Sequence, residues 1–134
     1  MQFRSHLATL STLALIGLSS PGYAFEIGFD WSGLKSCTSG NPGTVGSPAF
    51  TLSDIPEGTK FIRFKLVDRD VPGFNHGGGV VEWNGSKTVP AGSFKYKQPC
   101  PPNGSHTYEW QATAQTKKNG GKLETAKAQR KYPE

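Results

Sequence analysis

The sequence places ionisable side chains at the ends of two apolar strand patterns. Side chains two residues apart share one face of a β-strand. In residues 60–68 this periodicity puts Asp68 on the apolar face, and in residues 106–115 it puts His106 and Tyr108 on such a face. A half-buried carboxylate or imidazole requires a partner. Binding sites are often found where such groups gather.

A second histidine, His76, follows the first segment and precedes three glycines. Two imidazoles can donate hydrogen bonds to an anion, and the Tyr108 hydroxyl can add another. Asp68 would orient or charge one of the imidazoles, as carboxylates do for histidine. The N–H groups of Gly77 and Gly78 could approach a ligand closely, because glycine carries no side chain. These groups could hold a small anion if they converge, but their spacing in the sequence does not by itself show convergence.

Other interpretations of the same residues stay open. A carboxylate at a strand end can cap the following turn, and a lone histidine near a core can be structural. Asp68, His76 and His106 could also form a metal site of two imidazoles and one carboxylate, which would indicate an enzyme. The glycine-rich segment and residues 99–104 could instead present a surface to a protein partner, for instance as a protease inhibitor.

The sequence contains no common catalytic or cofactor-binding motif. It has no nucleophile elbow, no HExxH and no phosphate-binding glycine loop. We therefore predict a non-enzymatic protein that uses no cofactor and no metal.

Residues 1–24 have the layout of a secretory signal peptide. Arg4 supplies the positive charge, residues 7–18 are mostly apolar, and Ala24 ends a small-x-small cleavage site. The apolar stretch is too short to span a bilayer. We expect cleavage after Ala24, a single mature domain of residues 25–134 without a transmembrane segment, and a periplasmic or secreted location.

Two cysteines, Cys37 and Cys100, are present in the sequence. An exported chain meets an oxidising compartment, and an even number of cysteines permits one bridge. Neither cysteine has a second cysteine or a histidine at metal-ligand spacing. We therefore predict a disulfide between Cys37 and Cys100.

The net charge of the chain is positive but modest. Fifteen basic and ten acidic residues give a formal net charge of +5. Nucleic-acid-binding surfaces combine basic residues with motifs or interleaved aromatic side chains, which the basic segments here lack. We therefore do not expect a nucleic-acid partner.

Short segments separated by turn residues predict an all-β fold. The 17 glycines and 10 prolines are spread along the chain, as in β-sandwiches and barrels. Asn84 and Gly85 predict a type I′ hairpin between two of the strands, and residues 34–47 have the composition of a loop. The expected strands are residues 26–31, 49–52, 60–68, 80–83, 86–89, 93–97, 106–115 and 123–132.

Two separated stretches resemble one known family. They are FIRFKLVDRDVPGFNHGGG, which begins at Phe61, and PCPPNGSHTYEW, which begins at Pro99. They resemble the phosphatidylethanolamine-binding protein family, and within it the bacterial Raf-kinase-inhibitor-like branch. The family combines an Asp-Pro-Asp-x-Pro segment and a downstream histidine with a later Gly-Pro-Pro and His-Arg-Tyr.

The resemblance implies a β-sandwich with a small pocket, open to solvent at one end, that binds anions such as phosphate or phosphorylated head groups. Relatives in the family also include protease inhibitors. This chain is shorter than typical members, so we expect a shortened sandwich of this type. It carries Gly77 where a large aromatic residue usually follows the histidine. By the resemblance, the pocket residues are Asp68, His76, Pro102, His106 and Tyr108.

Overall fold

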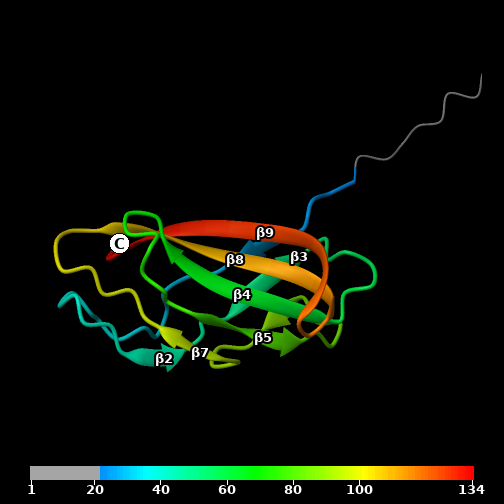
Figure 1. Cartoon of the computed structure of the whole chain (residues 1–134), viewed down its shortest axis with the longest axis horizontal. Coiled ribbons are helices and arrows are strands. Elements are labelled where there is room, and N and C mark those ends of the chain that lie inside the picture. Colours follow the sequence, from blue (N-terminus) through cyan, green and yellow to red (C-terminus); the bar gives the residue numbers. More distant parts are fainter. Residues whose placement is uncertain (1–21) are drawn as a thin grey trace, which may run out of the picture.

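The computed structural model describes residues 22–134 (Figure 1). Within this part of the chain all the assigned regular structure is β-strand, and no helix could cross a membrane. Most of the predicted signal peptide, residues 1–21, lies outside the described residues. The strands are β1 (Glu26–Gly28), β2 (Thr44–Gly46), β3 (Phe50–Ser53), β4 (Phe61–Asp68), β5 (Gly78–Glu82), β6 (Thr88–Val89), β7 (Lys95–Lys97), β8 (His106–Lys117) and β9 (Gly120–Tyr132).

The strands form the predicted sandwich. One layer is a four-stranded antiparallel sheet in the order β5-β4-β8-β9, whose strands run side by side across the molecule in Figure 1. Against it lie a three-stranded sheet, β1-β3-β6, and the two-stranded pair β2-β7. The long strands β8 and β9 form a hairpin that supplies half of the larger sheet. The all-β fold class is therefore confirmed.

Aromatic side chains fill the space between the layers. The rings of Phe50 in β3 and Phe64 in β4 stack with centroids 4.3 Å apart, and Trp110 in β8 meets Phe50 edge-on at 5.3 Å. All three side chains are fully buried, and each contributes roughly 1.5–3 kcal/mol by leaving water. This packing fixes β4 and β8 relative to each other, and with them the groups at their ends.

The predicted hairpin around Asn84 and Gly85 is wrong. Strand β5 pairs with β4, whereas β6 pairs with β3 in the other layer. The Asn84 side chain does close a turn, since its Oδ1 accepts a hydrogen bond from the Ser86 N–H at 3.0 Å. The chain uses this turn to cross between layers, so the backbone groups on either side bond to different strands.

The segment predicted as a loop over residues 34–47 contains a strand. Its residues Thr44–Gly46 form β2 and pair with β7. The turn-forming residues around it hide this strand, because it is only three residues long. The last strand was predicted from residue 123 and begins three residues earlier, at Gly120.

The predicted disulfide between Cys37 and Cys100 is confirmed. It joins residues 63 positions apart and ties the segment before β2 to the proline-rich loop before β8. A backbone hydrogen bond from the Gly40 N–H to the Cys100 carbonyl, at 3.0 Å, supports the same connection. The bridge therefore closes one end of the sandwich.

Replacing both cysteines, Cys37→Ala with Cys100→Ala, should lower the free energy of unfolding. Closing a loop of this length contributes about 4 kcal/mol in the chain-entropy model. Urea denaturation should show the loss as a lower midpoint. Reduction of the wild-type protein serves as the control and should give a similar midpoint. Unchanged midpoints in both experiments would contradict a stabilising role for the bridge.

Candidate functional site

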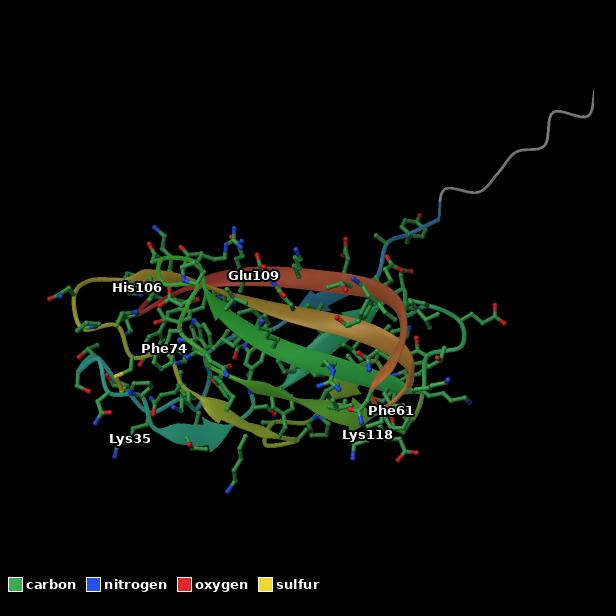
Figure 2. All side chains as sticks on the ribbon, in the orientation of Figure 1. Lys35, Phe61, Phe74, His106, Glu109 and Lys118 are labelled. Atoms are coloured by element: carbon green, nitrogen blue, oxygen red, sulfur yellow. A yellow bond between two sulfur atoms is a disulfide. The ribbon has the colours of Figure 1, made fainter. Side chains whose placement is uncertain are left out.

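A small cavity lies at the end of the sandwich closed by the disulfide. Its volume is about 160 Å³, the volume of about five water molecules. Figure 2 shows His106 and Phe74 at this end of the molecule, with Phe61 and Lys118 at the other. The lining residues are Gly40, Pro42, Asp68, Val71, Phe74, His76, Cys100, Pro101, Pro102, His106 and Tyr108.

The antiparallel pairing of β4 with β8 brings the predicted residues together. Asp68 is the last residue of β4 and pairs directly with Tyr108, while His106 is the first residue of β8. The end of one strand therefore meets the start of the next at the rim of the core. His76 and Pro102 reach the same cavity from two loops, so all five residues implied by the resemblance line it.

The Asp68 carboxylate is buried and uses both of its oxygens. Oδ1 accepts hydrogen bonds from the backbone N–H groups of Asp70, at 2.9 Å, and Val71, at 3.2 Å. Oδ2 lies 2.7 Å from Nδ1 of His106. Asp68 thus caps the turn after β4 and also orients the imidazole. The two roles expected for Asp68 from the sequence, capping a turn and orienting a histidine, are therefore compatible.

The Asp68 contact fixes which nitrogen of His106 is available. An ionised carboxylate only accepts hydrogen bonds, so Nδ1 of His106 carries the proton and donates it. Nε2 is then the nitrogen left for a ligand. The ring lies nearly parallel to that of Tyr108, with centroids 6.2 Å apart.

His76 is held in the same way by the backbone. Its Nδ1–H donates to the carbonyl oxygen of Lys97 at 2.8 Å, and its own carbonyl accepts from the Lys97 N–H, also at 2.8 Å. Burial lowers the pKa of His76 below its ordinary value of 6.5, and the Lys97 carbonyl opposes this shift only in part. The ring is therefore neutral at pH 7, with a lone pair on Nε2.

The Tyr108 ring lies close to both imidazoles. Its ring meets that of His76 edge-on, with centroids 5.6 Å apart. Burial raises the pKa of Tyr108 well above its ordinary value, and the negative charge of Asp68 raises it further. The hydroxyl therefore keeps its proton, and a hydrogen bond with the Asp68 carboxylate also contributes to the raised pKa.

Gly77 and Gly78 do not line the cavity. The Gly77 N–H donates to Oδ1 of Asn75 at 2.9 Å, and Gly78 pairs with Lys65 inside the sheet. A side chain at Gly78 would overlap the carbonyl oxygen of Phe64. Gly78 therefore lets β5 pack against β4, and neither glycine is part of the cavity lining.

Sequence analysis missed several lining residues, and Phe74 is the most informative. Its ring packs on that of His76, with centroids 4.5 Å apart, and the ammonium of Lys97, at the end of β7, lies 5.7 Å from the Phe74 ring centroid. An aromatic residue two positions before the histidine was the available signal. Phe74 thus places an aromatic ring beside His76 although Gly77 directly follows the histidine.

Two carboxylates and one imidazole at this end of the sandwich lie close enough together to be considered as ligands for a metal cation. Ligand atoms of Asp68, Asp70 and His106 lie within 4.8 Å of one another. His76, expected in such a group, is not part of it. Several of these atoms are already engaged, because Asp68 binds the turn and His106, and Oδ2 of Asp70 accepts from the Thr107 N–H at 2.7 Å. The geometry favours a hydrogen-bonded network.

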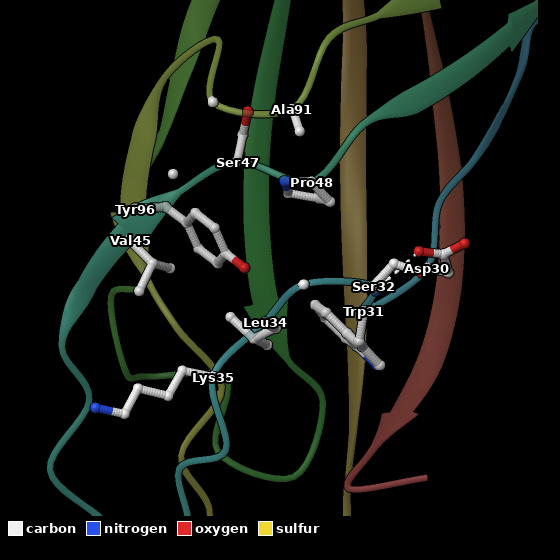
Figure 3. A pocket seen from close by; sticks show the side chains of 13 residues that line it. Asp30, Trp31, Ser32, Leu34, Lys35, Val45, Ser47, Pro48, Ala91 and Tyr96 are labelled. Atoms are coloured by element: carbon white, nitrogen blue, oxygen red, sulfur yellow. Dashed lines mark hydrogen bonds between the residues drawn. The ribbon is translucent and has the colours of Figure 1, made fainter.

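A larger cavity, of about 460 Å³, lies beside β2 and β7 (Figure 3). Trp31, Leu34, Val45 and Tyr96 supply much of its apolar surface. Among the described residues, Asp30 and Lys35 are the charged side chains that line this larger cavity, and none of its lining residues is a histidine. The smaller cavity is therefore the better candidate for anion chemistry, since its imidazoles and hydroxyl converge.

Gly78→Ala should destabilise the protein, whereas Gly73→Ala should not. The new methyl group at Gly78 would meet the backbone of β4, but a methyl group at Gly73 would have open space around it. We expect a loss of about 1–3 kcal/mol in the free energy of unfolding for the first variant and a change within about 0.5 kcal/mol for the second. Urea denaturation measures both. Equal effects would contradict the packing role of the glycines.

The protein should lose stability through His76 as the pH falls. The folded-state pKa of His76 is lowered below 6.5, so the unfolded chain binds the proton more readily than the folded protein. The contribution of His76 is then fully present above about pH 6.5 and is lost as the pH falls toward the folded pKa. Urea midpoints at pH 7 and pH 5 should fall less for His76→Gln than for wild type. An equal fall in both would exclude this linkage.

No protein-family model and no curated protein sequence matches this chain. Two solved structures share its fold. One, described as a phosphatidylethanolamine-binding protein homologue from Chlamydia trachomatis, has a TM-score of 0.58 at 18% identity and covers 83% of this chain and 98% of its own. The other, YbcL of Escherichia coli, described as a member of the mammalian phosphatidylethanolamine-binding protein family, has a TM-score of 0.60 at 19% identity and covers 82% and 98%. The expected fold is thereby confirmed, and residues 22–134 have the architecture of phosphatidylethanolamine-binding proteins.

Proposed function

We propose that this chain is an exported, non-enzymatic binding protein whose small cavity accepts an anion, either phosphate or a phosphorylated head group. The observation that carries the proposal is that His76 and His106 line one cavity and both lie against the Tyr108 ring. The Nδ1–H of each imidazole donates a hydrogen bond to an acceptor within the protein. Each therefore keeps Nε2 for a ligand, and the buried tyrosine keeps its hydroxyl proton.

The state of His76 determines how an anion binds. A neutral imidazole accepts hydrogen bonds through Nε2, whereas an imidazolium donates them. Because burial lowers the pKa of His76, the ring is neutral in the free protein at pH 7. An anion at Nε2 would favour the charged ring by direct attraction. Binding would then take up a proton.

Asp68 lines the cavity and supports the site through its hydrogen bonds. A carboxylate would repel an anion, but both oxygens of Asp68 are occupied by the turn and by His106. Its role is to hold His106 in the tautomer and orientation that leave Nε2 available. Pro102 and Phe74 supply apolar walls that limit the volume.

NMR titration of the histidine ring signals tests the proposal. At pH 6, inorganic phosphate and phosphoethanolamine should each shift the His76 and His106 signals with saturation in the millimolar range. A stronger response to phosphoethanolamine would indicate head-group recognition, and an equal response would indicate free phosphate. Unmoved signals with both compounds would contradict the proposal.

Two variants make the titration specific. His106→Gln should weaken binding by about 10- to 150-fold, because one hydrogen bond to a charged group contributes roughly 1.5–3 kcal/mol. Glu82→Gln changes an exposed carboxylate on β5, outside the cavity lining, and should leave binding unchanged. Equal weakening in both variants would point to a general electrostatic effect instead of a site.

A protein partner is the second candidate, and one observation favours it. Val71 and Phe74, both lining the cavity, are unusually exposed for apolar residues, at 46% and 39%. Such residues often contact partner proteins. Phe74→Ala should then abolish capture of a partner from the exported fraction while the histidine signals still respond to phosphate.

A further inference from the structure

The packed part of the molecule begins abruptly at Phe25. The Phe25 side chain is 3% exposed and belongs to the aromatic core, whereas that of Tyr23 is 79% exposed. The Gly22 position is also unpacked, since a Cβ atom there would have no neighbour within 4 Å. Packing therefore starts one residue after Ala24, at the position where the sequence predicts cleavage of the signal peptide.

The backbone nitrogen of Phe25 has a carboxylate as its partner. It donates a hydrogen bond to Oε1 of Glu124, at 2.9 Å, in a partly buried position. Phe25 lies next to β1, and Glu124 lies in β9, 99 residues further along the chain. This bond therefore joins the start of the packed chain to its last strand. In the uncleaved chain the donor is a neutral peptide N–H.

We propose that cleavage between Ala24 and Phe25 converts this hydrogen bond into an ion pair between the Phe25 α-ammonium and Glu124. In this reaction a processing peptidase adds water across the peptide bond. The C–N bond breaks and the water oxygen bonds to the Ala24 carbonyl carbon, so that Ala24 leaves as a carboxylate. The Phe25 nitrogen keeps its one hydrogen and gains the two hydrogens of the water, which makes it an ammonium. The inference rests on the export proposed above but is independent of the anion cavity.

The new charge forms where a negative partner already lies within hydrogen-bonding distance. Hydrogen bonds between charged groups are shorter and roughly twice as strong as those between neutral groups. A partly buried pair is also screened by salt less than an exposed one. Cleavage of the signal peptide would thus strengthen the contact between the segment that precedes β1 and strand β9. The precursor would lack this contribution and unfold more easily, which suits a chain that must be exported.

The first test is the exported protein itself, produced from the full chain. Its intact mass should correspond to a chain that begins at Phe25 and contains one disulfide. Any other first residue in the exported protein would overturn the proposal.

The second test measures whether the two charges are coupled. Residues 25–134 contain every strand that the structure describes in residues 22–134, so proteins beginning at Phe25 or at Gly22 can be compared, each with and without Glu124→Gln. With Glu124 present, the Phe25 form should melt about 3 °C higher than the Gly22 form, the shift expected for one favourable pair in a domain of this size. With Glu124→Gln the difference should fall below about 1 °C.

A matched variant excludes a general effect of net charge. Glu82→Gln removes one carboxylate from β5, at the opposite edge of the same sheet from β9. It should preserve the full difference between the two N-termini. The same difference in melting temperature in all three backgrounds would overturn the proposal, because the N-terminus would then act without Glu124.

Discussion

The carboxylate of Asp68 is the interaction on which the candidate site depends. One oxygen accepts hydrogen bonds from the turn that follows β4, and the other orients the first imidazole of β8. The group is buried at the rim of the aromatic core. A buried carboxylate without partners would be strongly destabilising, so the turn and His106 satisfy a requirement that the strand itself creates. The same bonds that satisfy Asp68 also aim the histidine.

The rest of the fold can be understood as support for this arrangement. Stacked aromatic rings between the layers hold β4 and β8 in register, so that Asp68 lies opposite Tyr108. The disulfide and the Lys97 carbonyl position the two loops that complete the cavity. The histidines are therefore held by backbone and carboxylate acceptors before any ligand arrives. Such preorganisation lowers the entropic cost of binding.

Part of this site could be predicted from the sequence because strand periodicity is a local property. Alternation alone placed Asp68, His106 and Tyr108 at the rim of the core, and the structure has them there. The choice of strand partners is not local, and there the predicted hairpin failed. Asn84 and Gly85 do form a turn, but nothing near them in the sequence shows that the chain crosses between layers. Gly78 was predicted to bind a ligand, but it is a glycine because the Phe64 carbonyl leaves no room for a side chain. That carbonyl lies on another strand, so the sequence around Gly78 does not show the constraint.

The central claim is that an anion binds by drawing a proton onto an imidazole that is neutral in the free protein. Sulfate tests this most directly, because it has the shape of phosphate and does not titrate near neutral pH. Calorimetric titration with sulfate at pH 7, in two buffers of different ionisation enthalpy, counts the protons taken up. The account predicts a net uptake of protons on binding, strongly reduced in His76→Gln, because burial keeps the His76 ring neutral in the free protein. Heats that are independent of the buffer, or no binding at all, would contradict it.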